Sequence, residues 1–150
     1  MAYEKPLPQP NSDDKFFWDG CKEHKLLLQK CLSCGLVRWP PSIICPYCHS
    51  NDTEIIEATG KGKIYTYAVY HQAYHPGFES EIPYVTAVIK LDEGPHFLSN
   101  IIYCKLHELE CDMPVEVSWE DITKEFSLPK FRPIRHGKND STSGRIIQEA

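Results

Sequence analysis

"CLSCGLVRWPPSIICPYCH", residues 31–49, contains two Cys-x-x-Cys pairs separated by ten residues. Each pair can place two thiolates on adjacent corners of one tetrahedral metal site, so the spacing predicts a single site with four sulfur ligands: Cys31, Cys34, Cys45 and Cys48. Four thiolates leave no open coordination position, which favours a structural zinc ion, although the same sulfur set can bind iron. A segment this short buries little apolar surface, so we expect metal binding to supply its folding free energy.

The residues around the cysteines favour tight turns and extended chain. Gly35 directly follows the first pair and permits the positive φ angle that a thiolate turn often requires. Pro46 lies inside the second pair and restricts the backbone of that turn. The connection between the pairs, residues 37–44, contains too many prolines for a helix and is expected to be extended. We therefore predict a rubredoxin-like zinc ribbon over residues 26–58.

The overall composition is typical of soluble globular proteins. A length of 150 residues suits one domain with a small second module, and a net charge of −5 disfavours binding to a phosphate backbone. The N-terminal residues contain no apolar signal region, and no apolar run is long enough for a membrane-spanning helix. We therefore expect a cytoplasmic location and no membrane partner.

The cysteine count also bears on the compartment. Seven cysteines, four of them in paired spacing, indicate a reducing environment rather than a secreted disulfide framework. Three cysteines lie outside the pairs and have no accompanying catalytic motif: Cys21, Cys104 and Cys111. We expect each of them to be a small buried hydrophobic residue.

Residues 1–25 predict an extended arm followed by a helix. Three prolines within the first ten residues favour extended chain, and an arm of this kind can lie over a partner. Ser12 is expected to be the N-cap of a short amphipathic helix that continues to about residue 24. Three adjacent aromatic residues in this helix need a packing partner, which is either the chain's own core or another subunit: Phe16, Phe17 and Trp18.

Residues 59–136 predict five short strands. Apolar and polar residues alternate in five runs separated by Gly, Pro and acidic turns: 63–71, 84–91, 97–104, 115–121 and 126–131. In the first run, regular alternation places Ile64 and Thr66 on one face with Ala68 and Tyr70. Five such strands favour a small barrel or sandwich. The last residues, 137–150, are polar and are predicted to form a flexible tail.

Several stretches of the sequence, in their order, resemble one protein family. They are FFWDGCKEHKLLLQKCLSCG, CPYCHSNDTEIIEATGKGKIYTYAVYHQAYHPGF, PYVTAVIKLDEGPHFLSNII and DMPVEVSWED, the last followed by LPKFRP. Together they cover nearly all of residues 16–134. The chain resembles the acyl-CoA-associated OB-fold proteins, also called domain of unknown function 35. The resemblance implies a mainly β fold, with an N-terminal helix, a rubredoxin-like zinc ribbon and a five-stranded OB-fold barrel.

The resemblance also implies a function within a complex. Members of this family accompany thiolases or thiolase-like acyltransferases as accessory subunits, with the ribbon and helix docked on the enzyme and the OB-fold helping to bind or channel an acyl-CoA. We therefore expect no catalytic residue in this chain and a hetero-oligomer with a thiolase-fold catalytic subunit. Thiolase chemistry needs an activated cysteine and further acid-base groups on a larger fold. Bacterial toluene degradation, with an enzyme of the benzoylsuccinyl-CoA thiolase type, is one setting that fits.

Two groups of residues are candidates for contact with CoA or with the partner. The loop after the first predicted strand provides histidine and aromatic side chains: His71, Tyr74, His75 and Phe78. These could line a pantetheine tunnel or meet a subunit, or they could form an ordinary surface loop. The phosphates of CoA require basic side chains, for which the candidates are Lys61, Lys63, Lys130 and Arg132. Charged residues at domain ends are also often simply solvated.

Two alternative functions remain open at this point. Zinc ribbons and OB-folds also bind single-stranded nucleic acid, and Tyr65, Tyr67 and Tyr70 could stack on bases, although the acidic net charge opposes this. The chain could also be a scaffold that binds protein but never acyl-CoA. Fold alone does not separate these functions.

Overall fold

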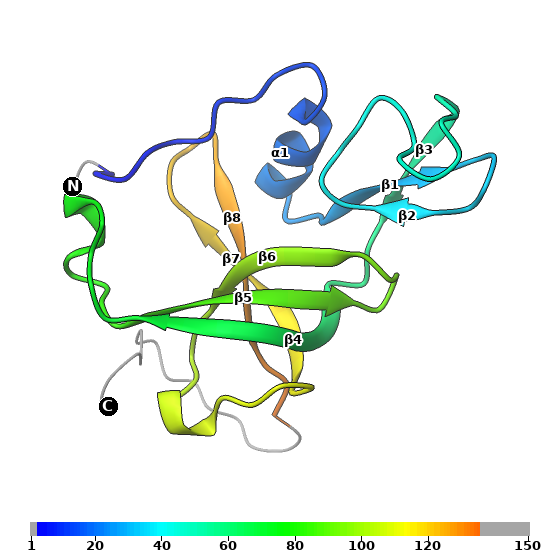
Figure 1. Cartoon of the computed structure of the whole chain (residues 1–150). Helices are drawn as coiled ribbons and strands as arrows, with labels where there is room; N and C mark the ends of the chain where they lie inside the picture. The colour runs from blue at the N-terminus through cyan, green and yellow to red at the C-terminus, as the bar shows by residue number, and fades with distance from the viewer. Residues whose placement is uncertain (1–2, 136–150) are drawn as a thin grey trace.

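The computed structural model describes residues 3–135, which form an N-terminal arm and helix, a three-stranded ribbon and a five-stranded barrel (Figure 1). The expected mainly β fold is confirmed. In chain order the elements are α1 (Lys15–Lys22), β1 (Leu27–Cys31), β2 (Val37–Arg38), β3 (Thr53–Glu57), β4 (Lys61–Tyr70), η1 (Pro76–Phe78), β5 (Tyr84–Leu91), β6 (His96–Ile101), η2 (Leu106–Glu108), β7 (Pro114–Asp121) and β8 (Ser127–Pro133). The predicted flexible tail lies outside the described residues. None of the described helices has the length and apolar character needed to cross a membrane.

The barrel closes in the strand order β4-β5-β6-β8-β7, because β7 returns to pair with β4. Its neighbouring strands are antiparallel except for β6 and β8, which form a short parallel pair at Ile101 and Phe131. Closure pairs the two edge strands of the sheet with each other, over residues 61–63 of β4 and 114–116 of β7. This is the five-stranded OB-fold barrel that the family resemblance implied, and it decides between the barrel and the sandwich that the strand pattern left open.

A β-bulge at Tyr65 corrects the predicted faces of the first barrel strand. The pairing of β4 with β5 shifts register between Ile64 and Thr66, so one extra residue interrupts the alternation. Ile64 points into the core, but Tyr67 and Val69, rather than Thr66 and Ala68, pack against the core beyond the bulge. The expectation of one regular face was wrong, because a single inserted residue moves every later side chain to the opposite face.

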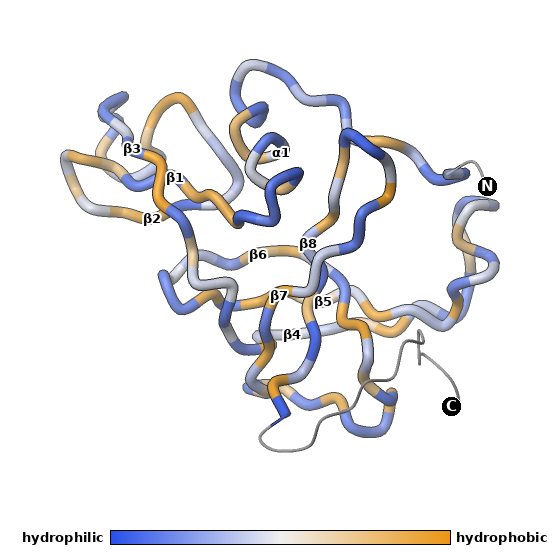
Figure 2. Tube along the Cα trace, turned by 180° about the vertical axis from the view of Figure 1, so that it is seen from behind, coloured by the Kyte–Doolittle hydropathy of each residue, from blue (hydrophilic) through white to orange (hydrophobic). Residues whose placement is uncertain are grey.

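One hydrophobic core joins the helix, the ribbon and the barrel. The fully buried barrel residues include Ile64, Ile89 and Phe131, and the same cluster contains Phe17 from α1 and Leu28 from β1. Hydrophobic and hydrophilic residues both occur along the barrel strands in Figure 2, and in β5 buried residues alternate with more exposed ones. Burial of each large side chain contributes roughly 1.5–3 kcal/mol to the free energy of unfolding. Because the helix and the ribbon contribute side chains to this core, their packing stabilises the barrel as well.

The helix is shorter than predicted and packs closely on the ribbon. It begins at Lys15 after Asp14, and residues 12–14 form a turn instead of its first turn, so the prediction of Ser12 as N-cap was wrong. The turn competes successfully because the Asn11 N–H donates to the Asp14 side chain at 2.7 Å. At Gly20 an added Cβ would come within 2.7 Å of the Leu27 side chain, which shows how closely α1 approaches β1.

The N-terminal arm lies against the chain's own barrel. Figure 1 shows it passing from α1 to the region of η1. Lys5 forms an ion pair with Glu81 at 2.7 Å, and its ammonium group also lies 5.0 Å from the centre of the Phe78 ring. Both members of the ion pair are mostly buried. The predicted extended arm is therefore present, and in this chain it covers the connection between β4 and β5.

Candidate metal centre and ligand cavity

The first cysteine pair forms a tight turn at the end of β1. The Cys31 N–H donates to the Leu36 carbonyl at 2.8 Å, and the Gly35 N–H donates to the Cys31 carbonyl at 2.9 Å. Gly35 has a φ angle of 79°, in the left-handed region that glycine adopts without strain. The expected role of this glycine agrees with the geometry.

The second pair repeats the same turn with a different residue at the critical position. The Cys45 N–H donates to the Ser50 carbonyl at 2.8 Å, and the His49 N–H donates to the Cys45 carbonyl at 2.9 Å. His49 therefore corresponds to Gly35, and it has a φ angle of 63°. Sequence reasoning missed this equivalence, because a histidine after a cysteine pair first suggests a competing metal ligand.

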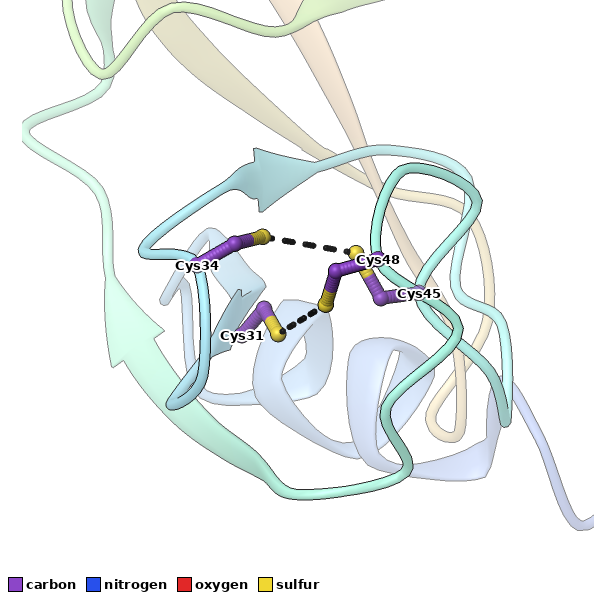
Figure 3. A group of neighbouring side chains, drawn as sticks. All are labelled: Cys31, Cys34, Cys45 and Cys48. Atoms are coloured by element: carbon purple, nitrogen blue, oxygen red, sulfur yellow. Dashed lines mark hydrogen bonds between the residues drawn. The ribbon is translucent and has the colours of Figure 1, made fainter.

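The four cysteine sulfurs face one another and fit a zinc ion. Cys31 Sγ lies 3.5 Å from Cys48 Sγ, and Cys34 Sγ lies 3.7 Å from Cys45 Sγ (Figure 3). All four sulfurs lie within 4.8 Å of one another. A tetrahedral zinc site with Zn–S bonds of about 2.3 Å requires sulfur-sulfur distances of about 3.8 Å. The donor set and its dimensions therefore match a closed, structural zinc site.

The backbone of each turn is already arranged to stabilise thiolates. Donation from the Cys34 N–H is the largest influence on the Cys31 thiol and lowers its pKa to about 6, and the Cys48 N–H likewise lowers the pKa of Cys45. The Leu36 N–H acts in the same direction on Cys34, but burial and the neighbouring thiols outweigh it and raise that pKa to about 12. Four thiols in one small volume cannot all ionise without a cation, which a divalent metal supplies.

Arg38 is a buried element of the ribbon that no sequence signal revealed. Its side chain is 5% exposed, and its guanidinium donates to Gln29 Oε1 at 3.0 Å, to the Ser42 carbonyl at 2.9 Å and to Thr53 Oγ1 at 3.0 Å. These bonds tie β2 to β1, to β3 and to the connection that carries the second cysteine pair. The planar guanidinium suits this role because it offers several donors in a rigid arrangement.

The three remaining cysteines differ from one another in exposure. Cys21 and Cys104 are buried, as expected, and burial raises the pKa of both thiols, that of Cys21 to about 12. Cys111 is exposed, so the expectation of burial was wrong for this residue. Cys111 lies in the turn that precedes β7, where the backbone runs over the surface.

The predicted loop residues separate into exposed and inward-facing side chains. His71, Tyr74 and His75 are exposed, and His75 Nδ1 accepts a hydrogen bond from the Gly77 N–H at 3.0 Å. Phe78 is half-buried, with its ring centre 5.5 Å from that of Tyr84. The His75 ring makes an edge contact with Phe78, with ring centres 6.2 Å apart, but neither His71 nor His75 lines the cavity that Phe78 lines. Of the four predicted residues, Phe78 is the one that lines a cavity.

That cavity has a volume of about 530 Å³ and lies beneath the N-terminal arm. Its walls come from the arm, from Phe78 at the end of η1, from residues 80–85, from the end of β6 and the residues after it, and from β7 and β8. Volumes of this size are typical of small-molecule sites. The predicted candidates Phe78 and Lys130 both line it, whereas Lys61, Lys63 and Arg132 do not.

The predicted basic residues form a row across the barrel rather than a common cradle. Lys61 on β4 is paired in register with Glu116 on β7, which in turn is paired with Arg132 on β8. Arg132 Nε lies 3.2 Å from Glu116 Oε1, so an acid separates the two bases. Lys63 is exposed on β4, and Lys130 forms an ion pair with Glu120 at 2.6 Å. A phosphate would have to compete with these carboxylates for two of the four bases.

The aromatic residues of the helix pack mainly within the chain. Phe17 is 1% exposed, and its ring centre lies 4.2 Å from that of Trp39. Phe16 and Trp18 are half-buried, and Trp18 makes an edge contact with Phe126. The sequence left two packing partners open, the chain's own core and another subunit. Phe17 packs in the chain's own core. A contact of Phe16 or Trp18 with another subunit stays a prediction.

Comparison with known sequence families gives two adjacent matches. The profile of the ChsH2 rubredoxin-like zinc ribbon domain matches residues 18–54, and the profile of the ChsH2 C-terminal OB-fold domain matches residues 56–120. These ranges coincide with the ribbon and with most of the barrel.

Individual relatives and a solved structure extend the comparison. A probable enoyl-CoA hydratase alpha subunit of Thermomonospora curvata is 38% identical over 129 residues, which are 86% of this chain but only 40% of that protein. A DUF35 domain-containing scaffold protein of Methanocaldococcus jannaschii is 38% identical over 127 residues, which cover 79% of this chain and 89% of that protein. A chain of the solved Ltp2-ChsH2(DUF35) aldolase has a TM-score of 0.77 and 38% identity, with 85% of this chain and 98% of that chain covered.

Proposed function

Because this chain belongs to the DUF35 family of zinc-ribbon and OB-fold proteins, we propose that it is a non-catalytic subunit of an acyl-CoA enzyme complex. In this proposal the ribbon docks on a catalytic subunit of the thiolase type in the cytoplasm, and the OB-fold helps bind or channel the acyl-CoA. The relatives compared above include a protein described as a scaffold, and the Ltp2-ChsH2(DUF35) aldolase pairs such a chain with an enzyme.

The observation that carries the docking role is the apolar surface of the ribbon. Leu32, Ile43 and Tyr47 are each at least 60% exposed and lie in the connections that carry the cysteines. Exposed apolar side chains gathered on one small module mark an interaction site. The zinc site holds these connections rigid, so the surface is preorganised for a partner.

Two of the three cysteines outside the ribbon are buried, which supports a non-catalytic role. The third, Cys111, is exposed in the turn before β7 and does not line the cavity. Acyl transfer of the thiolase type proceeds through a cysteine thiolate that must reach the thioester. Cys21 and Cys104 are buried with raised pKa values, so neither provides an accessible thiolate. The four cysteines of the ribbon would be consumed by the metal. The catalytic cysteine would therefore belong to the partner.

Docking and acyl-CoA binding are assigned to opposite sides of the molecule. Figure 1 shows the ribbon and the β4–β5 connection on opposite sides of the barrel. The β4–β5 connection contains Tyr74, which is 77% exposed. The ribbon contains Tyr47, which is 78% exposed. The two tyrosines are thus a matched pair for separating the two roles. Within this proposal, a bulky aromatic acyl-CoA of the type formed during toluene degradation is one substrate that fits.

The test is co-purification with the enzyme encoded beside this chain, using a tag on this chain alone, followed by an assay of acyl-CoA thiolysis. We expect Tyr47→Ala to reduce recovery of the enzyme at least several-fold. Tyr74→Ala should leave recovery unchanged and raise the KM for acyl-CoA. If the enzyme is equally active without this chain, or if both variants behave like the unaltered protein, the proposal is wrong.

A second function, binding of single-stranded nucleic acid, has one observation in its favour. Tyr65 is 57% exposed on the outer face of the barrel, and its ring centre lies 4.5 Å from that of His96. Stacking on such a pair is the usual way that OB-folds hold bases. The net charge of −5 opposes it. Salt-dependent affinity for an oligonucleotide that is lost in Tyr65→Ala would favour this function over the acyl-CoA role.

A further inference from the structure

The cavity beneath the N-terminal arm has rigid aromatic walls. Tyr84 stacks on Tyr70 with ring centres 5.0 Å apart and planes inclined by 5°, and it also contacts Phe78. Trp119, which also lines the cavity, stacks on His24 with ring centres 5.4 Å apart and planes inclined by 2°. In both cases a second ring outside the cavity holds the wall in place. A preformed apolar pocket of this kind loses little entropy on binding a flat ligand.

The charges in the cavity wall form two matched pairs. Lys5 is paired with Glu81 at 2.7 Å, and Lys130 with Glu120 at 2.6 Å. The four side chains are only 10–21% exposed, so water screens them weakly. A ligand with a charge of its own would bring a third charge into this partly desolvated space, where one member of each pair would repel it. The wall therefore selects against both anions and cations.

The same ion pairs leave hydrogen-bond donors for a neutral ligand. Each lysine ammonium has three N–H donors. Lys5 Nζ donates to both carboxylate oxygens of Glu81, at 2.8 and 2.7 Å, so one of its three N–H groups is left for a ligand. Asn100, also in the wall, donates its amide N–H to the Val85 carbonyl at 3.0 Å, which fixes the orientation of its carboxamide. A carbonyl or hydroxyl group on an otherwise apolar ligand would find partners here.

We propose that this cavity binds an uncharged, mainly apolar ligand, aromatic or alicyclic, that carries a carbonyl or hydroxyl group. The ligand lies between the aromatic walls, with its polar group toward the lysines. The proposal goes beyond the function given above, because it holds whether or not the chain docks on an enzyme. The N-terminal arm serves as one wall, so the ligand contacts residues from both ends of the described chain.

Three probes of one shape test the charge selection: 2-naphthamide, 2-naphthoate and 2-(aminomethyl)naphthalene. We expect the zinc-loaded full chain to bind 2-naphthamide saturably at one site, with a shift of the Trp119 indole N–H signal in nuclear magnetic resonance spectra. Each ion should bind at least tenfold more weakly. Absence of saturable binding, equal affinity for an ion, or shifts confined to the outer face at Tyr65 and Leu98 would overturn the proposal.

Substitutions then locate the site. Leu128→Trp and Ser80→Trp place bulk in the wall and at its rim, and each should weaken binding of 2-naphthamide at least tenfold. Leu98→Trp is the matched control, because Leu98 is 63% exposed on β6 and does not line the cavity. Ser80 is exposed, so its substitution keeps the test valid if Leu128→Trp fails to fold. Retained binding in both wall variants contradicts the proposal.

Charge substitutions give a directional result that simple loss of structure cannot mimic. Lys5→Met leaves Glu81 without its lysine, so the aminomethyl probe should gain affinity and 2-naphthoate should lose it. Glu120→Gln leaves Lys130 without its carboxylate and should reverse the preference. If both variants keep the charge preferences of the unaltered chain, the probes bind elsewhere and the proposal is wrong.

Discussion

His49 occupies in the second cysteine turn the same left-handed backbone region that Gly35 occupies in the first, with φ angles of 63° and 79°. Each of these residues donates its N–H to the carbonyl of the first cysteine of its own pair. The two turns therefore have the same geometry, but only the second carries backbone strain. An L-residue in this region carries a strain of roughly 1–2 kcal/mol that glycine avoids.

This equivalence predicts opposite effects of two substitutions. Gly35→Ala should lower the free energy of unfolding by about 1 kcal/mol, and His49→Gly should raise it by up to about 1 kcal/mol, less the added flexibility of the unfolded chain. An added Cβ at Gly35 meets nothing within 4 Å, so the stability change in Gly35→Ala measures backbone strain without a steric clash. Thermal unfolding of the zinc-loaded protein measures both. Equal stability of the two variants would contradict the strain argument.

The metal site was predictable from the sequence because its information is local. Two Cys-x-x-Cys pairs specify both the ligands and the turns that carry them, and the distances among the four sulfurs agree with that prediction. The conformation of His49 was not predictable from its own identity. It follows from the hydrogen bonds of the turn, which impose a positive φ on whichever residue follows the second cysteine.

Removal of the metal should unfold the ribbon. Cys45→Ser should lower zinc affinity at least about 100-fold, because loss of a direct ligand exceeds the usual effect of altering a supporting residue. Trp39, which joins the ribbon to the core, should then become more exposed, with a red shift in its fluorescence. Protons compete with the metal for thiolates, so zinc retention should fall as the pH decreases. Cys111→Ser is the control, since Cys111 lies outside the cluster; equal zinc content in both variants would count against this site.

The three cysteines outside the cluster should react at very different rates. In the zinc-loaded native protein, Cys111 should be alkylated rapidly because it is exposed. Cys21 and Cys104 should react at least about 100-fold more slowly, since both are buried and their pKa values are raised, which leaves little accessible thiolate. Mass spectrometry of peptides after timed alkylation measures this order. Rapid labelling of Cys21 would mean that α1 separates readily from the barrel.

Phe17 should be essential for stability. It is 1% exposed and lies against Trp39, with Phe97 of the barrel 6.1 Å away between ring centres. Phe17→Ala should lower the free energy of unfolding by about 3–5 kcal/mol, as other buried aromatic truncations do. Phe16 is half-buried and provides the matched control, with an expected loss below about 2 kcal/mol. Denaturant titration measures both; similar losses would show that the helix packs differently.

The core and the cavity show where sequence reasoning reached its limit. Alternation predicted the strands, but the bulge at Tyr65 exchanges the faces of the later residues of β4, and nothing in the residues around it marks the insertion. Trp39 received no role because it lies in a proline-rich connection, yet it joins helix, ribbon and barrel. The cavity depends on Lys5 and Glu81, which are far apart in sequence. Such contacts follow from tertiary packing, which local patterns do not encode.

The hydrogen bond between His24 and Asp121 should give the protein a distinct acid sensitivity. His24 Nε2 lies 2.7 Å from Asp121 Oδ1, and this hydrogen bond is the main cause that lowers the pKa of Asp121 below its ordinary value of 3.8. A lowered pKa means that the folded state favours the carboxylate, so its contribution is complete above 3.8 and is lost as the pH falls through the lower folded value. His24 also stacks on Trp119, so loss of the pair should change the fluorescence of Trp119. Asp121→Asn should remove this pH dependence, while Asp92→Asn, an exposed acid in the β5–β6 turn, should keep it. Identical acid titrations of stability for both variants would show that the pair does not contribute.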